Sequence, residues 1–234
     1  KESVMLRGVD NNKDQTYFLC QLNQNQLNNS LFPIGELTKP EVRKIAEELD
    51  LPVAHKKDST GICFIGERDF REFLKNYIPA KSGKMVDIVS KKVIGEHQGI
   101  MYYTIGQRKG LGIGGNGEPW FVVGKDYDKN ILYIAQGDSN KWLLSHGALI
   151  TDVNWISATK PEGEYDCTAK FRYRQKDNDV SLHFIDETTL YVTFKKPIKA
   201  VTPGQAAVFY DGDVCLGGGT IDKVYKDGKE IDYL

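Results

Sequence analysis

Short runs of alternating apolar residues fill the chain from about residue 146 onward, and they constrain its fold more than any other feature. Apolar side chains recur at every second position over residues 180–184 and 190–194, and again at Ala207 and Phe209. Turn signals such as Pro203-Gly204 and Asp211-Gly212 separate the runs. Short strands at regular intervals are typical of a small barrel. We therefore expect a closed or nearly closed antiparallel β-barrel over residues 144–234.

The first 80 residues have a different texture, which predicts mainly helices. Thr38-Lys39-Pro40-Glu41 supplies a capping threonine, a proline in the first turn and a glutamate three residues after the cap. Apolar residues then recur at helical spacing over residues 42–49, and Pro52 ends the run. A second run at the same spacing covers residues 70–77.

The middle of the chain, residues 80–143, alternates β-type runs with glycine-rich turns. The runs cover residues 85–89, 100–104, 120–123 and 131–134. We expect an α+β protein of three parts, with boundaries at 1–79, 80–143 and 144–234.

The glycine-rich stretch 106–117 matches G-x-G-x-x-G twice, but the context argues against dinucleotide binding. That fingerprint requires a helix after the glycines, whereas Pro119 and a β-type run follow here. A flexible loop is the better interpretation. Arg108 and Lys109 at its entrance remain candidates for contact with phosphate, because glycines let backbone N–H groups approach an anion.

Charge and cysteine usage exclude several classes of protein. Lys+Arg number 31 against 32 Asp+Glu, so bulk charge does not hold this chain on nucleic acid. No apolar run is long enough for a membrane-spanning helix, no signal peptide is visible, and we expect a cytoplasmic protein without a membrane partner. The four histidines and four cysteines show no metal-ligand spacing, so no metal site is predicted. The chain does not begin with Met, and we expect it to be part of something longer.

Cys63 is the cysteine of most interest. It lies between Gly61 and Gly66, near Lys57 and Arg68, and positive charge favours a reactive thiolate. A buried, inert cysteine is an equally good interpretation of the local sequence. Cys20, Cys167 and Cys215 stand in apolar contexts that favour packing.

Two segments mix cations, amides and aromatic residues, residues 13–17 and 171–175. Such mixtures suit RNA, which is bound by base stacking together with hydrogen bonds to phosphates and base edges. A solvated strand face explains the same composition without any ligand, and on this pattern alone it is the more common explanation.

Longer motifs carry a resemblance to a known family. They run in order along the chain: Lys13-Asp14-Gln15, F-P-I-G-E-L at 32–37, K-D-S-T-G-I-C-F-I-G-E-R at 57–68, G-E-H-Q-G at 95–99, G-Q-R-K-G-L-G-I-G-G at 106–115, R-Y-R-Q at 172–175, T-P-G-Q at 202–205 and C-L-G-G-G at 215–219. In these motifs the chain resembles the tRNA-specific 2-thiouridylases, the MnmA family.

The resemblance implies a sulfurtransferase. The family uses ATP to adenylate the C2 oxygen of the wobble uridine, position 34 of tRNA, and a cysteine persulfide then replaces that oxygen with sulfur. The cysteine of D-S-T-G-I-C-F is the carrier, which corresponds to Cys63. Its sulfur comes from a persulfide donor, a cysteine desulfurase or a sulfur-relay protein. Lys57 and Arg68 are our own candidates for holding the anionic sulfur.

The resemblance also implies contacts with tRNA. The K-D-Q motif corresponds to Lys13, Asp14 and Gln15, the R-Y pair to Arg172 and Tyr173, and the glutamine of T-P-G-Q to Gln205. The implied fold is the end of an α/β ATP-pyrophosphatase-like domain, a small central β-rich domain and a C-terminal β-barrel.

The chain departs from the family in one large way. The S-G-G-x-D-S pyrophosphate-binding loop does not occur in it, and Cys20 does not match the second cysteine that pairs with the carrier in a disulfide. We therefore expect the polypeptide to be inactive alone. The alternatives are a non-catalytic tRNA-docking module, which would not depend on Cys63, and a generic thiol-redox protein, which would not bind RNA.

Overall fold

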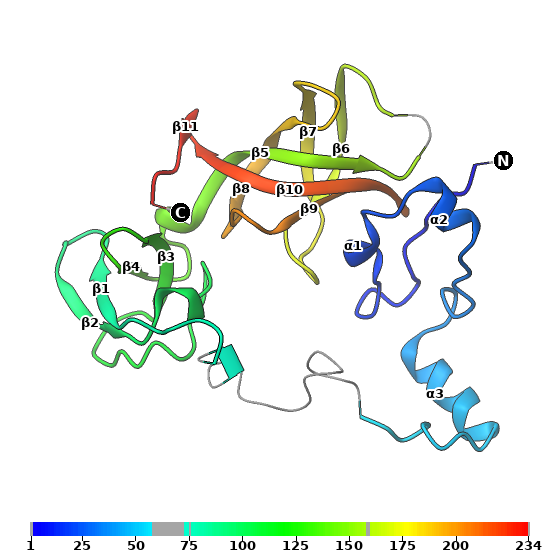
Figure 1. Cartoon of the computed structure of the whole chain (residues 1–234), viewed down its shortest axis with the longest axis horizontal. Helices are drawn as coiled ribbons and strands as arrows, with labels where there is room; N and C mark the ends of the chain where they lie inside the picture. Colours follow the sequence, from blue (N-terminus) through cyan, green and yellow to red (C-terminus); the bar gives the residue numbers. More distant parts are fainter. Residues whose placement is uncertain (1, 58–72, 75, 158–159, 234) are drawn as a thin grey trace. The chain divides into compact units, whose positions relative to one another are not determined.

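The computed structural model describes residues 2–57, 73–74, 76–157 and 160–233. The chain forms two compact units (Figure 1). Unit 1 joins Lys1–Lys56 to Ser145–Glu230, and unit 2 joins Lys57–Leu144 to the last residues, Ile231–Leu234.

Six strands of unit 1 close into a barrel, as the alternating pattern predicts. The strands are β5 (Leu144–Trp155), β6 (Glu164–Lys170), β7 (Asn178–Phe184), β8 (Leu190–Lys199), β9 (Ala206–Asp211) and β10 (Val214–Lys226). They follow the order β10-β5-β8-β7-β6-β9, and the pairing of β9 with β10 closes the barrel. The short β11 (Lys229–Glu230) extends β10 as a hairpin.

The interior of the barrel consists of the apolar half of each alternating run. Val180, Leu182, Val192 and Phe209 are all fully buried. Burying side chains of this size stabilises the fold by about 1.5–3 kcal/mol each, which is why the period-two pattern specifies the strands so firmly.

The C-L-G-G-G run of β10 is glycine-rich because neighbouring strands approach it closely. A Cβ on Gly219 would lie 2.6 Å from the Thr151 carbonyl oxygen of β5, and one on Gly218 would lie 2.5 Å from the Ala207 carbonyl oxygen of β9. Any side chain at these positions would push apart the strands that close the barrel.

The N-terminal part of unit 1 contains three short helices: α1 (Thr16–Leu19), α2 (Gln24–Asn28) and α3 (Lys39–Glu48). The capping signal at the start of α3 is confirmed, since the Thr38 backbone N–H and hydroxyl both donate to the Glu41 carboxylate at 2.7 Å. The prediction of a mainly helical segment is wrong for residues 2–57, because α1, α2 and α3 together cover only about a third of them and turns and irregular chain make up most of the rest. Half of the second predicted helix, residues 70–77, falls outside the described residues.

The apolar face of α3 has little to pack against among the described residues. Ile45 is 42% exposed and Leu49 is 64% exposed. The helix is therefore fixed by its cap and its proline, while its apolar spacing contributes little burial in this structure.

Unit 2 contains a four-stranded sheet of order β2-β1-β4-β3. The strands are β1 (Gly83–Asp87), β2 (Val93–His97), β3 (Trp120–Asp126) and β4 (Ile131–Gln136), with β1 and β4 parallel. Two 3₁₀ turns accompany them, η1 (Ile100–Tyr102) and η2 (Lys141–Leu143).

One predicted strand of unit 2 is wrong. Residues 100–104 begin with the 3₁₀ turn η1, directly after Gly99 at φ 140°. Ile100, Tyr102 and Tyr103 are all buried, so the apolar run serves a compact turn. Periodicity alone does not separate a short buried strand from a short buried turn.

His97 at the end of β2 predicts an acid-sensitive unit 2. The ring is fully buried, Nε2 lies 3.1 Å from the Asn130 carbonyl oxygen, and Nδ1 accepts a bond from the Gly99 N–H at 3.2 Å. Burial lowers the pKa of His97 below its ordinary value near 6.5. The neutral ring therefore contributes stability above about pH 6.5, and that stability is lost as the pH falls below this value.

Hydrogen exchange measured between pH 7.5 and 5 tests this prediction. We expect the opening free energy of the β1 and β4 amides to fall with pH. His97 is the one histidine in residues 57–144, so a His97→Gln variant should lose this dependence. A pH dependence that survives in the variant would contradict the assignment.

Candidate nucleic-acid interface

The N-terminal segment adds to the end of β10 and thereby carries the K-D-Q loop to the barrel. The Cys215 N–H donates to the Met5 carbonyl at 2.9 Å, and the Arg7 N–H donates to the Asp213 carbonyl at 2.8 Å. On the other side of the loop, the Tyr17 hydroxyl donates to the Ala206 carbonyl at 2.9 Å. Burial raises the pKa of Tyr17 to about 12, so this hydroxyl stays a neutral donor at physiological pH.

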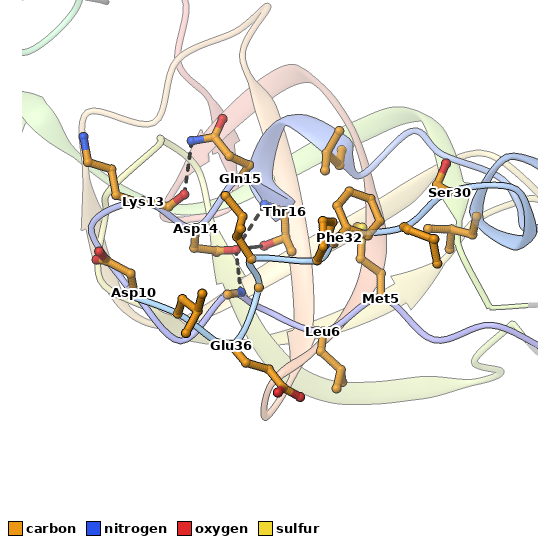
Figure 2. Close-up of a pocket in the computed structure, with 18 of the residues that line it drawn as sticks. Met5, Leu6, Asp10, Lys13, Asp14, Gln15, Thr16, Ser30, Phe32 and Glu36 are labelled. Carbon is orange, nitrogen blue, oxygen red and sulfur yellow. Dashed lines mark hydrogen bonds between the residues drawn. The ribbon is translucent and has the colours of Figure 1, made fainter. Parts of the chain in front are cut away.

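Asp14 shapes the K-D-Q loop from inside. Its carboxylate accepts the Gly8 N–H and the Thr16 N–H, each at 3.2 Å, and also the Thr16 hydroxyl at 2.8 Å (Figure 2). Asp14 is only 6% exposed. Its neighbours Lys13 and Gln15 are more exposed than Asp14 and lie on either side of it.

Gln15 and Tyr173 bring together two motifs that lie far apart in the sequence. The Gln15 side-chain amide donates to the Tyr173 hydroxyl at 2.9 Å. Tyr173 lies in the turn between β6 and β7, 158 residues further along the chain. The structure thus joins the K-D-Q loop to the R-Y-R-Q turn.

Arg172 links the same turn to the T-P-G-Q motif. Its guanidinium donates to the Thr202 hydroxyl at 3.2 Å. The Gln205 N–H donates to the Thr202 carbonyl at 3.3 Å and closes a turn over residues 202–205. The Gln205 side chain is exposed on this turn. All three predicted tRNA-contact motifs therefore meet in one connected cluster of hydrogen bonds.

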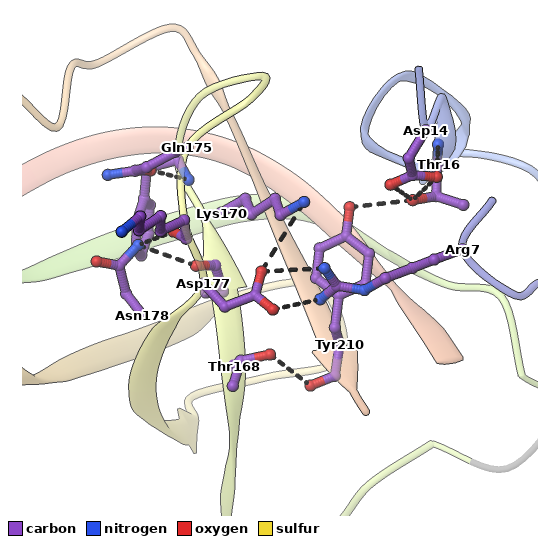
Figure 3. Close-up of polar contacts among 12 residues, drawn as sticks. Arg7, Asp14, Thr16, Thr168, Lys170, Gln175, Asp177, Asn178 and Tyr210 are labelled. Carbon is purple, nitrogen blue, oxygen red and sulfur yellow. Dashed lines mark hydrogen bonds and ion pairs between the residues drawn. The ribbon is translucent and has the colours of Figure 1, made fainter. Parts of the chain in front are cut away.

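A network that the sequence does not reveal supports this cluster (Figure 3). The Arg7 guanidinium lies 3.7 Å from the centre of the Tyr210 ring and pairs with the Asp177 carboxylate at 3.0 Å. Lys170 reaches the same carboxylate at 3.9 Å. The Tyr210 hydroxyl lies 3.3 Å from the Thr16 hydroxyl, which is bonded to Asp14. No sequence signal predicts the network, because Arg7 and Asp177 are 170 residues apart.

A largely apolar cavity of about 760 Å³ lies beside the K-D-Q loop, whose residues form part of its lining (Figure 2). The F-P-I-G-E-L motif lines one side of it, and Met5, Leu6 and Leu27 are among the residues that line the rest. Phe32 and Ile34 are more than half exposed at this cavity. The motif therefore contributes apolar surface beside the loop.

Two of the three described cysteines, Cys20 and Cys215, are packing residues, as expected, and Cys167 is half-buried. Cys20 and Cys215 are buried in one apolar cluster of unit 1. Burial raises the pKa of all three described thiols, those of Cys167 and Cys215 to about 12. Cys63 and Arg68 lie outside the described residues, and Lys57 is exposed.

Arg108 and Lys109 belong to unit 2. Gln107 shapes the turn before the glycine-rich stretch, since its side chain accepts the Thr104 N–H and donates to the Lys109 carbonyl. Strand β3 begins at Trp120, shortly after the last of the glycines, so the predicted β-type run is confirmed and a strand, not a helix, follows the stretch. Arg108 and the glycines line a cavity of about 340 Å³.

Over residues 2–57, 73–74, 76–157 and 160–233, no three His, Cys, Asp or Glu side chains stand close enough to hold a metal ion. No helix in the described part of the chain is long and apolar enough to cross a membrane.

The barrel and its cluster have features in common with a known class of protein. A small β-barrel with exposed aromatic, amide and cationic side chains on adjoining turns is typical of proteins that bind RNA. Three family models match the chain in order: a tRNA methyl transferase HUP domain over residues 1–67, a tRNA methyl transferase PRC-barrel domain over 71–136 and an aminomethyltransferase beta-barrel domain over 145–221.

Full-length relatives agree with these models. The chain is 60% identical over 233 residues to a tRNA-specific 2-thiouridylase MnmA of Bacillus cytotoxicus, and 59% identical to proteins of the same name from Bacillus cereus and Bacillus thuringiensis. Each match covers the whole chain and 62% of the relative's length. The chain belongs to the family of the tRNA-specific 2-thiouridylases.

Proposed function

We propose that this chain provides the tRNA-binding and sulfur-carrying parts of a tRNA 2-thiouridylase. The observation that carries the proposal is the meeting of K-D-Q, R-Y and T-P-G-Q in one cluster, through the bonds Gln15–Tyr173 and Arg172–Thr202. The names of the relatives give the substrate class, a tRNA that contains a uridine to be thiolated.

The residues of the cluster divide into two roles. Lys13, Gln15, Arg172, Tyr173 and Gln205 supply cations, amides and a phenol, which suit phosphates and the edges of unpaired bases. Asp14 is a positioning residue, because its carboxylate is buried and bonded to the loop itself. Arg108 and Lys109 of unit 2 are proposed phosphate contacts.

Cys63 is the proposed sulfur carrier. A donor, a cysteine desulfurase or a sulfur-relay protein, leaves a persulfide on its thiol. ATP converts the uridine C2 oxygen into an adenylate and releases pyrophosphate. The terminal persulfide sulfur then forms the new bond to C2, and AMP leaves with the oxygen. The thiolate of a second cysteine then attacks the Cys63 sulfur and breaks its bond to the transferred sulfur. The two cysteines are thereby oxidised to a disulfide, and the transferred sulfur is reduced and stays on C2.

A further proposal concerns the ATP-dependent step. The S-G-G-x-D-S loop is absent from the 234 residues, so we propose that this polypeptide alone does not adenylate the uridine. ATP-dependent thiolation by the polypeptide would contradict this.

We also propose a cytoplasmic location and the domain division 1–79, 80–143 and 144–234, with the HUP segment as the end of an ATP-pyrophosphatase-like fold.

Equilibrium binding of a tRNA transcript with a wobble uridine tests the proposed function. We expect binding that weakens steeply with salt, since phosphate contacts release counterions. Arg172→Ala should weaken binding. It should also reduce the slope of log K against log salt concentration by roughly 0.7, the value for the loss of one phosphate contact on a single strand. Lys44→Ala, which removes an exposed lysine from α3, is the matched control and should bind as wild type does. Salt-independent binding, or equal effects of the two variants, would argue against the assignment.

A further inference from the structure

Beside the K-D-Q loop, Tyr173 is flanked by two residues, Phe18 and Arg174, that are not among the proposed tRNA contacts. Phe18, on α1, is 59% exposed. Its ring centre lies 4.6 Å from that of Tyr173, at an interplanar angle of 46°. Arg174 places its guanidinium 5.3 Å from the Tyr173 ring centre. Single exposed phenylalanines are ordinary, so it is the grouping with a tyrosine and an arginine that calls for an explanation.

A buried tyrosine packs against the cluster on its barrel side. The Tyr17 ring lies 5.4 Å from the Phe18 ring at 89°, and Tyr17 is anchored to the barrel through Ala206. Tyr17 is only 7% exposed. Phe18 follows it directly in the helix, and its N–H donates to the Gln15 carbonyl at 3.0 Å. The Phe18 backbone is therefore fixed, while its ring faces solvent.

The opposite side of the cluster is a turn with an unfavourable backbone conformation. Arg174 has φ 64°, in the left-handed region that non-glycine residues rarely adopt. The turn is closed by its own glutamine, since the Phe171 N–H donates to the Gln175 side chain at 2.8 Å and the Gln175 N–H donates to the Arg172 carbonyl at 3.1 Å. Such conformations persist where the surroundings enforce them, commonly at binding sites. Here the turn displays Tyr173 and Arg174 beside Phe18.

We propose that Phe18, Tyr173 and Arg174 form a stacking site for an unpaired nucleobase of the RNA loop that contains the target uridine. This inference rests on the proposed function. Aromatic rings and arginine guanidinium planes are the groups on which splayed bases stack. Gln15, bonded to the Tyr173 hydroxyl, supplies an amide at the edge of the same site. Phe18 makes its contribution through ring area alone, without charge.

Phe18 variants separate stacking from charge. Phe18→Ala should weaken tRNA binding roughly five- to hundredfold, the range for loss of one stacked base. The salt slope should stay unchanged, because a phenyl ring releases no counterions. Phe18→Leu should lose most of the tRNA affinity although it keeps apolar bulk. Phe18→Trp keeps an aromatic ring and should bind tRNA about as tightly as wild type does. Phe32→Ala is the matched control, because Phe32 is an exposed phenylalanine outside the cluster.

A fluorescent base gives an independent readout. Anticodon stem-loops that carry 2-aminopurine at successive unpaired positions should show quenching at one position with wild type, and the quenching should be lost with Phe18→Leu. Binding of wild-type strength by both Phe18→Ala and Phe18→Leu, or no quenching at any position, would overturn the stacking site. If wild type itself fails to bind tRNA, the proposed function has failed, which is a different result.

Discussion

Replacing Cys63 with serine is expected to reduce sulfur loading of this chain to background. A serine oxygen cannot form a persulfide, so the loss should be complete and not graded. The measurement uses a cysteine desulfurase with ³⁵S-labelled cysteine, followed by non-reducing electrophoresis and peptide mapping. Wild type should carry label on the peptide that contains Cys63, and Cys63→Ser should carry none.

The structure supplies the controls for that experiment. Burial raises the pKa of Cys167 and Cys215 to about 12 and that of Cys20 in the same direction. At pH 7.5 a thiol with such a pKa is ionised in on the order of one molecule in ten thousand or fewer. Cys167→Ser should therefore load sulfur as wild type does. Label on Cys167, or full loading of Cys63→Ser, would contradict the carrier assignment and favour a docking module.

Replacing Asp14 with alanine should have the second-largest effect, on both stability and tRNA binding. The change leaves the Gly8 and Thr16 N–H groups without their buried acceptor. Each unpaired buried group costs about 1–3 kcal/mol, and Gly8 is only partly buried, so we expect unit 1 to lose about 2–4 kcal/mol of unfolding free energy. The loop that presents Lys13 and Gln15 would no longer be held in shape, so tRNA affinity should fall as well.

Two variants make the Asp14 result interpretable. Asp14→Asn keeps one acceptor oxygen at the same place and should lose less stability than Asp14→Ala. Asp179→Ala removes an exposed aspartate from β7 and should change neither property. Urea unfolding followed by Trp155 fluorescence, with Trp120 and Trp142 replaced by phenylalanine, reports on unit 1 alone. An Asp14→Ala variant of wild-type stability would show that the internal bonds of the loop are dispensable.

The sequence predicts the barrel well because period-two patterning has few alternative solutions. Val180 and Leu182 are buried together only if the strand keeps one register. The start of α3 is equally predictable, since Thr38 and Glu41 satisfy each other locally. Residues 100–104 are mispredicted because a short apolar run suits a buried turn as well as a strand.

The interior contacts of the candidate interface could not be predicted. The K-D-Q motif names three polar residues, and nothing in their spacing shows that Asp14 is buried while Gln15 is exposed. The Arg7–Asp177 pair and the Phe18–Tyr173 contact join residues more than 150 positions apart. Only the path of the chain around the barrel brings such residues together, and no local pattern encodes it.

Hydrogen exchange of the 234-residue chain, with and without a saturating tRNA transcript, shows directly whether the three motifs bind RNA together. We expect slower exchange in three separate segments, around residues 13–19, 171–175 and 202–206, because they form one RNA-binding cluster. Unchanged exchange in all three segments at saturating tRNA would contradict it and would place the RNA elsewhere on the chain.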